Sequence, residues 1–481
     1  MERDYDIIVA GGGLSGLVAA TTAAHVAKQK LRILVIDRNP SDDQGKKTVS
    51  GWVCGDAVGA HGPDYFKKFT GIKYGKPEIE HFVKGVIAYS PDREASLKFT
   101  EDGYILNRRL MPQRMKNDAE KLGVEFVNEA LLQRVLADNG MVYGVEGTKD
   151  GKPFRKTAKV VIDATGQASV LRVNLPIKSY IEKTIDRNDL ETTGRYIMEF
   201  EHAKEDITFF DPNYCVIHLD NILAPGGYAW VFPKGPNKVN IGLGVNKTCH
   251  DERNRKLGKN QDLKGLIDEY VKLNPVLKNT RPSQDPNDKG NSYGTWQVSV
   301  RRQNDCLAAN GYMIIGDAAW MAKPLDAGGM GPAFFSGTIA GKRAAEAVEA
   351  NDSSEKFLWK YAHDFMLERG LNTPGMEIFR RMLQKIDNSQ LNYGTRHFLS
   401  KMDMDKITRG EHPDFSSLDK IEMMIRGALN MKLAKEMKYT ASKNKSLSTL
   451  FKSYPDTPDK FPAWHSLVMK EMQEAFKRYP F

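Results

Sequence analysis

The residues best suited to holding a cofactor lie near the start of the sequence, where glycines recur at a fixed spacing. The apolar segment 5–10 is typical of a buried strand, and the turn after it contains Gly11, Gly13, Ser15 and Gly16. The first glycine of such a motif permits a tight turn, the second lets the backbone approach a pyrophosphate, and the third allows close packing of helix and strand. Free N–H groups and the dipole of the following helix favour an anion. The pattern predicts a dinucleotide site.

A second strand and an acidic residue extend this prediction. After a small, alanine-rich helix expected over 17–28, the apolar segment 31–36 ends at Asp37. This carboxylate lies about 20 residues beyond the last glycine, where the motif places an acceptor for ribose hydroxyls. A glycine turn in another α/β fold is the alternative, but the two strands, the helix and the acid together favour the dinucleotide site.

Two later segments indicate which dinucleotide to expect. An apolar strand over 160–166 closes on the letters A-T-G, and a second one over 312–315 ends at Gly316 and Asp317. A small-residue helix is predicted over 333–345, and the cluster before it consists of Gly328, Gly329, Met330 and Gly331. With its three motifs in this order, the chain resembles the flavoprotein family that contains aromatic hydroxylases and geranylgeranyl reductases.

The resemblance implies non-covalent binding of FAD. Asp317 would hydrogen-bond a ribityl hydroxyl, and the backbone of 328–331 would lie beside the flavin pyrimidine. The physics agrees, because a reduced flavin is negative near N1 and O2 and a helix N-terminus offers N–H donors and a positive dipole there. The segment 103–108 resembles one that brings an arginine near the flavin, so Arg108 is expected to serve, with Arg109 as the alternative.

An aromatic strand is the main candidate for binding substrate. Tyr228, Trp230 and Phe232 alternate along the sequence and therefore share one face of a strand, with a return strand expected over 239–245. Three aromatic residues on one face often form core. The motif P-x-x-Y-x-W-x-F-P-x-G, however, resembles the signature of geranylgeranyl reductases. The resemblance implies that this strand lines a cavity over the flavin. An aromatic wall suits an oily polyene.

Cys54 is the candidate catalytic residue. The segment 51–57 resembles the C-G-D-A loop of the archaeal reductases, which implies a position near the flavin. Cys54 could donate a proton, act as a redox-active thiol, or be an inert loop cysteine. A regulatory disulfide with Cys306 is a further hypothesis. The four cysteines form no C-x-x-C pair, so no metal site is expected.

Length and pattern predict an α/β fold in three parts, since 481 residues exceed one compact core. We expect a discontinuous Rossmann-type FAD-binding domain, similar to the aromatic-hydroxylase-like flavoproteins, over 1–70, 103–180 and 300–345. An antiparallel β-sheet substrate domain is expected over 71–102 and 181–299, and a mostly helical C-terminal domain over 346–481. Apolar residues recur at helical spacing in the last domain, over 357–366, 376–383 and 418–437. Its methionines serve either as core or as a lining for flexible chains.

The resemblance implies a reductase that saturates carbon–carbon double bonds of geranylgeranyl chains, with archaeal ether lipid precursors as the expected substrates. A flavin monooxygenase of an aromatic or lipid substrate is the main alternative. It is weakened because Trp320 and Pro332 stand where hydroxylases commonly carry His and Asn. A non-redox polyene cyclase or isomerase is a third possibility. The sequence holds no second strand–glycine–helix unit, so the external electron donor, a ferredoxin or NADPH, is left open.

The charge and hydropathy of the sequence limit where the protein is expected to act and which partners it is expected to have. The net charge of +9 favours an anionic partner such as a phosphate-bearing lipid or a membrane surface, and we expect no nucleic acid. No apolar run reaches the length needed to span a bilayer, and no signal peptide is recognisable, so a cytoplasmic protein is expected. The segment 432–438 is basic and amphipathic. It is either a solvated helix face or a peripheral contact with the membrane.

Overall fold

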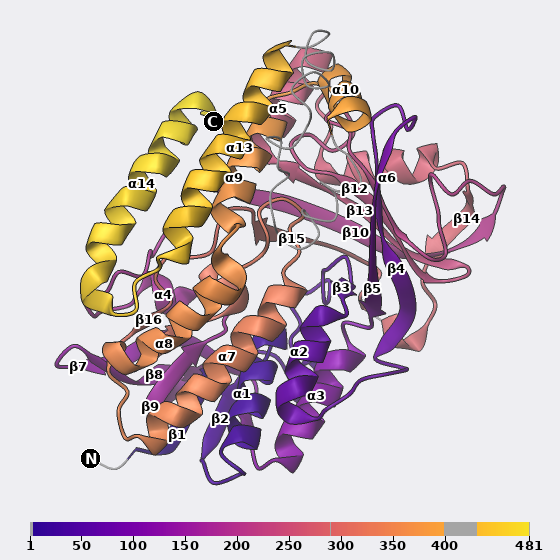
Figure 1. Cartoon of the computed structure of the whole chain (residues 1–481). Coiled ribbons are helices and arrows are strands. Elements are labelled where there is room, and N and C mark those ends of the chain that lie inside the picture. The colour runs from indigo at the N-terminus through magenta and orange to yellow at the C-terminus, as the bar shows by residue number, and fades with distance from the viewer. Residues whose placement is uncertain (1–2, 289, 399–430, 481) are drawn as a thin grey trace.

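The computed structural model describes residues 3–288, 290–398 and 431–480, which form two large β-sheets and the helices that cover them (Figure 1). The first sheet consists of β1 (Tyr5–Ala10), β2 (Ile33–Ile36), β6 (Glu125–Val127), β7 (Ala130–Asp138), β8 (Met141–Lys149), β9 (Lys152–Asp163), β16 (Ala308–Ala309) and β17 (Tyr312–Ile314). The second sheet consists of β3 (Ala57–Gly59), β4 (Ile79–Tyr89), β5 (Ser96–Leu106), β10 (Leu190–His202), β11 (Cys215–His218), β12 (Ala229–Gly235), β13 (Lys238–Asn246), β14 (Leu277–Pro282) and β15 (Tyr293–Ser299). The helices are α1 (Leu14–Val26), α2 (His61–Thr70), α3 (Leu110–Lys121), α4 (Val170–Val173), α5 (Lys247–Leu257), α6 (Leu263–Leu273), α7 (Met330–Glu349), α8 (Glu355–Phe365), α9 (Thr373–Leu383), α10 (Asn388–His397), α13 (Met431–Lys452) and α14 (Phe461–Arg478).

The first sheet brings together segments from distant parts of the sequence. Its order is β16-β17-β9-β1-β2-β6, and the strands from β17 to β6 run parallel. Helix α7 packs directly on α1, so the indigo and orange segments lie side by side in Figure 1. Glycines permit this contact, because a Cβ atom on Gly337 would lie 2.6 Å from the Ser15 carbonyl oxygen and one on Gly341 would lie 2.3 Å from that of Ala19. The Rossmann-type architecture predicted from the glycine motif is confirmed.

The second sheet is almost entirely antiparallel, in the order β14-β10-β13-β12-β11-β4-β5-β3. Strand β13 shows the alternation expected from its sequence. Val239, Ile241, Leu243 and Val245 are buried in a cluster with side chains of α6. The opposite face of the same strand carries Asn240 and two glycines, and this face belongs to the candidate site described below.

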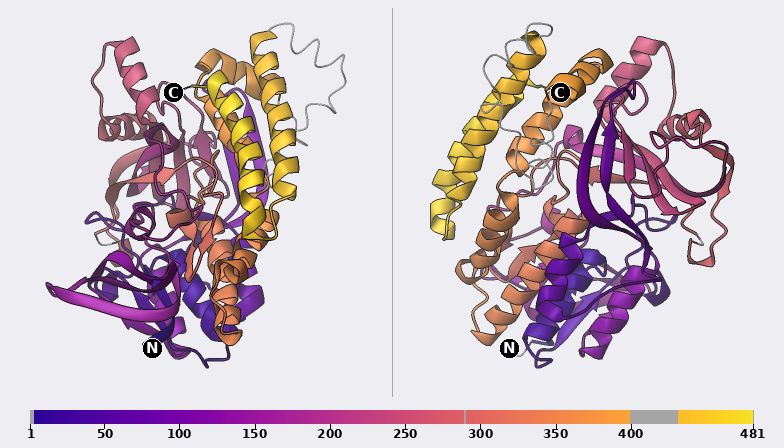
Figure 2. Two further views of the ribbon diagram at one scale, coloured as in Figure 1. Left: turned by 90° about the vertical axis from the view of Figure 1, so that its left-hand side faces the viewer. Right: turned by 45° about the vertical axis from the view of Figure 1, so that its right-hand side comes forward.

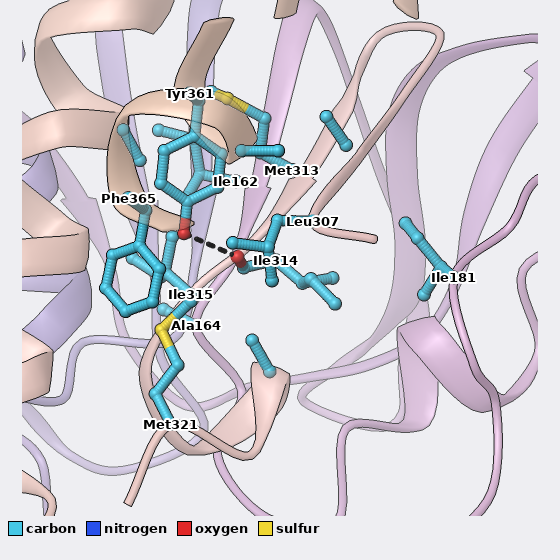
Figure 3. Close-up of a cluster of buried hydrophobic side chains, with 14 of the residues drawn as sticks. Ile162, Ala164, Ile181, Leu307, Met313, Ile314, Ile315, Met321, Tyr361 and Phe365 are labelled. Atoms are coloured by element: carbon cyan, nitrogen blue, oxygen red, sulfur yellow. Dashed lines mark hydrogen bonds between the residues drawn. The ribbon is translucent and has the colours of Figure 1, made fainter. Parts of the chain in front are cut away.

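The C-terminal helices stand beside the second sheet and above the first (Figures 1 and 2). Helix α8 is fixed to the first sheet by Tyr361, whose hydroxyl donates to the carbonyl oxygen of Ile314 at 2.9 Å within a cluster of buried aliphatic side chains (Figure 3). The predicted helices over 357–366 and 376–383 are observed as α8 and α9. Of the third, predicted over 418–437, only the part from 431 onward lies within the described residues, where it opens α13.

Two helices begin earlier than predicted. Helix α1 starts at Leu14 rather than 17, and α7 starts at Met330 rather than 333. In both cases residues of the glycine-rich segment itself form the first helical turn, which moves the helix N-terminus closer to the expected cofactor. Strand β5 continues to Leu106, and the domain limits given above stay a prediction. Among the described residues, we find no helix long and apolar enough to cross a bilayer.

Candidate active site

The glycine turn after β1 has the geometry of a pyrophosphate cradle. Gly11 has a φ of +107°, and a Cβ atom there would lie 2.3 Å from the carbonyl oxygen of Ala164. A Cβ atom on Gly16 would lie 2.0 Å from the carbonyl oxygen of Gly11. These two glycines are therefore required by packing. Gly13 differs, because a Cβ atom there would meet no other atom within 4 Å. The open space faces the N-terminus of α1, as binding of a dinucleotide phosphate requires.

Asp37 lies at the end of β2, beside the glycine turn. Its carboxylate accepts hydrogen bonds from the backbone N–H groups of Gly12 and Asn39, both at 2.7 Å. Burial raises the pKa of Asp37, and these two bonds oppose that change. The side chain is thereby held at the edge of the cradle, where the motif places the ribose.

The second half of the predicted cofactor site comes from the turn after β17 and the start of α7. A Cβ atom on Gly329 would lie 3.2 Å from Asp317 Oδ1, so the Gly316–Asp317 turn and the cluster 328–331 are in contact. Lys47, which the sequence reasoning did not single out, places its Nζ 3.5 Å from Asp317 Oδ2. Only its position between the second Rossmann strand and the C-G-D-A loop could have indicated it.

The two neighbouring arginines have different environments. Arg108 is buried, and its Nε and Nη1 atoms have no hydrogen-bond partner among the described residues. Arg109 instead donates to the carbonyl oxygen of Pro286 at 2.9 Å. Buried polar groups are almost always paired, so the orphaned guanidinium of Arg108 fits a cofactor acceptor. This observation favours Arg108 over Arg109 and, with the space at Gly13, fits a bound dinucleotide such as FAD.

A large cavity of about 1040 Å³ lies against the cluster 328–331. One wall comes from the second sheet and the Cys54 loop, and includes Tyr228 and Phe232. The opposite wall comes from α9, α10, α13 and the π-helical turn η5 (Met366–Gly370). This wall is mainly apolar and includes Phe365, Met376, Phe379, Leu383, Leu391, Leu433 and Met437. A π-helical turn is uncommon and is often found at functional sites.

Trp230 departs from the predicted arrangement of the aromatic strand, because it does not line this cavity. Its indole N–H donates to Asn240 Oδ1 at 2.9 Å, and its ring lies over Gly242, where a Cβ atom would be 2.7 Å away. The backbone of Gly55 lies beside the aromatic strand, because a Cβ atom on Gly55 would lie 3.1 Å from Phe232 and 3.9 Å from Trp230 Nε1. The indole supports the loop instead of facing the cavity.

The loop that carries Cys54 is held from below by buried polar side chains. Asn240 Nδ2 donates to the Cys54 carbonyl oxygen at 2.8 Å and to Asp56 Oδ2 at 2.9 Å. Lys234 Nζ lies 2.9 Å from the same carboxylate oxygen, and both side chains are fully buried. The pairing of Lys234 with Asp56 was not predicted from the sequence, although both residues lie within motifs named above. Their contact depends on the packing of β12 under the loop, which spacing alone does not reveal.

The four cysteines are free in this structure, so the regulatory disulfide suggested between Cys54 and Cys306 is not formed here and stays a hypothesis. Cys306 lies in the main core around the first sheet, where burial raises the pKa of its thiol and its S–H donates to the Ala308 carbonyl oxygen at 3.3 Å. Cys54 packs in a different cluster with residues of α2 and α3 and lines the cavity. The two thiols are thus held in separate environments.

Comparison with known proteins agrees with this geometry. The family described as geranylgeranyl reductase catalytic domain matches residues 189–278, and the family of FAD-dependent oxidoreductases matches residues 6–203. The chain is 32% identical to the digeranylgeranylglycerophospholipid reductase of Sulfolobus acidocaldarius, over 98% of both chains. It is 28% identical to the enzyme of the same name from Methanocella arvoryzae, over 85% of this chain and 94% of that protein.

Solved structures show the same fold. A geranylgeranyl bacteriochlorophyll reductase-like protein from Thermoplasma acidophilum superposes with a TM-score of 0.69 at 25% identity, over 91% of this chain and 99% of the other. A flavin-dependent brominase superposes with a TM-score of 0.62 at 15% identity, over 90% and 99% of the two chains. The second likeness concerns the fold alone, because one flavoprotein fold supports different reactions.

Proposed function

This chain belongs to the geranylgeranyl reductase family of FAD-dependent oxidoreductases, and we propose that it saturates carbon–carbon double bonds in the geranylgeranyl chains of archaeal ether lipid precursors. The cavity of about 1040 Å³ is the observation that carries this function. Ligand pockets usually fall at roughly 300–1,000 Å³, so the volume suits a long substrate. The aromatic side of the second sheet and the mainly apolar helical wall enclose it, and the predicted flavin site at 328–331 borders it.

An isolated double bond accepts hydride poorly. The reaction therefore needs a proton at one carbon as hydride reaches the other, with the alkene held in a fixed orientation. FAD, when bound and reduced, supplies the hydride. The chain's own residues have three tasks: to orient the prenyl chain, to exclude water, and to hold the proton. Tyr228 and Phe232 serve the first task, together with the helical wall opposite them. The sequence assigns the proton to Cys54, whose loop faces the cavity.

Tyr228 also links the two walls of the site. Its hydroxyl donates to the carbonyl oxygen of Asp326 at 2.6 Å, two residues before the glycine cluster. Burial raises the pKa of this phenol well above its ordinary value, so the group stays neutral and keeps donating at every physiological pH. We expect Tyr228→Phe to release the 323–328 loop and to weaken FAD binding, which fluorescence titration with FAD would measure.

An anaerobic assay tests the function. The flavin of the holoenzyme is reduced chemically, a digeranylgeranylated glycerophospholipid is added, and the flavin absorbance and lipid mass are followed. Flavin reoxidation without oxygen, with a gain of two mass units per bond, is expected. Reoxidation only after oxygen is admitted would favour the monooxygenase, and a rearranged lipid of unchanged mass would favour the cyclase or isomerase. Repeating the assay at steady state with a ferredoxin or NADPH identifies the external donor.

Helix α13 is the proposed contact with the membrane. Leu433 and Met437 line the cavity, whereas Lys432, Lys435 and Lys438 are exposed on the outer side of the same helix. A lysine near an anionic surface contributes about 1 kcal/mol, so a basic face beside the cavity suits an enzyme that takes its substrate from a bilayer.

Vesicle sedimentation tests this contact. Changing the three lysines together to Glu is expected to weaken binding to anionic vesicles by about a hundredfold. The matched control changes Arg255, Lys256 and Lys259, an exposed basic group beyond the cavity, to Glu. An equal loss in both triple variants would show that net charge, not α13, attracts the chain to the vesicle.

A further inference from the structure

We propose that the side chain of Glu191 is the acid that protonates the substrate alkene, the role that the sequence pattern assigned to Cys54. The inference rests on the proposed function. In the step, the alkene π pair forms a C–H bond with the carboxyl proton of Glu191, and the hydride taken from reduced FAD forms the other C–H bond. The alkene is reduced by two electrons and the flavin is oxidised by two. Glu191 is left as a carboxylate and regains its proton from water.

The strand register places Glu191 on the cavity face of the second sheet. On β10, residues 191, 193 and 195 point to one side, and Thr193 and Arg195 pair with Gly244 and Gly242 of β13. Gly242 in turn pairs with Trp230 of β12. Glu191 therefore lies on the same face as the aromatic strand, two strands away from it.

Glycines open the space between Glu191 and Tyr228. A Cβ atom on Gly244 would lie 3.4 Å from Glu191 Oε2, and one on Gly227 would lie equally close at 3.4 Å. The carboxyl group thus rests on the backbone of two glycines, one of which is the residue before Tyr228. Any larger side chain at these positions would separate the acid from the aromatic wall.

The carboxyl group of Glu191 borders the cavity and is not engaged elsewhere. Glu191, Tyr228 and the cluster 328–331 all line the same cavity, although Glu191 is only 5% exposed. No hydrogen bond or ion pair of its carboxyl group is found in the part of the chain that the structure describes. A structural glutamate at this depth would be expected to have a partner. Its acidic proton is therefore available to a bound ligand.

The surroundings of Glu191 keep a substantial fraction of it protonated at neutral pH. Arg380 faces it from α9, Tyr228 from the position just before β12, and Cys249 from α5. Burial raises the pKa of Glu191 to about 7, and Arg380 opposes the change only in part. The guanidinium of Arg380 is committed to Asp189, at 2.7 Å. A carboxyl group is a stronger acid than a thiol, and an acid that titrates near the working pH suits proton transfer.

The test compares Glu191→Gln and Glu191→Asp with the wild-type holoenzyme, using anaerobic single turnover of chemically reduced enzyme with a digeranylgeranylated glycerophospholipid. We expect Gln to slow flavin reoxidation by about 10²-fold or more, with unchanged lipid affinity, and Asp to retain part of the rate. The wild-type rate should fall as pH rises through about 7, and this decline should be absent in the Gln variant. Glu355→Gln, at a second desolvated glutamate outside the cavity, serves as the control.

A measurement independent of turnover accompanies the kinetics. At pH 6, the wild type should show an infrared C=O band of a protonated carboxyl group that Glu191→Gln lacks. In the wild type, this band should disappear as the pH rises through about 7. A Gln variant that keeps its rate and its pH decline would overturn the inference, and loss of activity only in Cys54→Ser would return the role to the thiol. A wild-type enzyme that gains no hydrogen in the lipid would overturn the proposed function itself, and the inference with it.

Discussion

Two glutamates of this chain are buried to almost the same degree and have opposite electrostatic surroundings. Glu377 on α9 is 1% exposed, and its carboxylate accepts from the backbone N–H of Arg302 at 3.0 Å and from Nη1 of the same arginine at 3.3 Å. Although burial opposes it, the charges of Arg302, Arg301 and Arg381 lower the pKa of Glu377. Glu191, 5% exposed, lies against glycine backbone, and its pKa is raised.

The difference shows that burial alone does not make a carboxyl group reactive. Where Arg302 and Asp305 complete an ion-pair cluster, the charge of Glu377 holds α9 on the segment before β16. Where two glycines replace charged partners, the same functional group is kept neutral and open to a cavity. The first arrangement supports the helical wall, and the second equips the cavity that this wall closes.

The largest effect is expected from breaking the ion-pair cluster. Arg302→Leu leaves Asp305 and Glu377 buried without their shared partner, and removal of one member of a buried pair costs about 3–5 kcal/mol. Chemical denaturation should show this loss. Arg281→Leu, which breaks an exposed pair with Glu199, is the control and should cost less than about 1 kcal/mol. Similar losses in the two variants would mean that the buried cluster is not a major support.

The Glu→Gln substitution should change the stability at pH 8 in opposite directions at the two glutamates. The raised pKa of Glu191 means that its contribution to stability is present below its unfolded pKa and is lost as pH rises through about 7. Glu191→Gln should therefore stabilise the protein at pH 8, by about 2–3 kcal/mol, and have little effect at pH 4. Glu377, with its lowered pKa, contributes above its unfolded pKa and loses this contribution in acid, so Glu377→Gln should destabilise at pH 8. Thermal unfolding across this pH range measures both, and equal signs at pH 8 would remove the contrast.

A smaller effect is expected from filling the space beside Glu191. In Gly244→Ala the new methyl group would lie 3.3 Å from Thr193 Cγ2 and 3.4 Å from Glu191 Oε2, so we expect a loss of stability of about 1–2 kcal/mol and a further rise in the pKa of Glu191. Gly242→Ala is the contrasting variant, because its Cβ atom would lie 2.2 Å from the Gly194 carbonyl oxygen and force the backbone apart. The pH at which single turnover slows should move upward in Gly244→Ala. An unchanged profile would contradict the placement of the carboxyl group.

The smallest effect is expected for a neutral hydrogen bond on the same face, which sets a baseline for the charged groups. Trp230→Phe removes the donor to Asn240 and should cost about 1 kcal/mol. Thermal unfolding and the affinity for FAD would be measured together, with Trp359→Phe, whose indole donates to the Pro455 carbonyl oxygen away from the cavity, as the matched control. A loss of FAD affinity confined to Trp230→Phe would show that the indole supports the Cys54 loop.

The sequence was most informative where a short motif determines its own geometry. The spacing of Gly11, Gly13 and Gly16 between one strand and one helix was enough to predict their role, although Gly11 also packs against Ala164 from a later part of the chain. Glu191 has no such motif, because its place in the cavity depends on the register of β10 with β13 and on α9, which follows nearly 190 residues later. Trp230 alternates with its neighbours as expected, but its indole packs against Asn240 and Gly242 of the next strand, and this contact could not be read from the spacing.

The position of β9 between β1 and β17 has a consequence for the protein during its synthesis on the ribosome. The glycine turn is made about 300 residues before the turn at Asp317 and the start of α7, which complete the cradle. At about 5–20 residues per second, the early half waits roughly 15–60 s for its counterpart. Until β9 is made, the nascent chain exposes the apolar strands β1 and β2, and we expect FAD to be captured only after the start of α7 has been made. A chaperone that shields these strands would therefore act before the cofactor does.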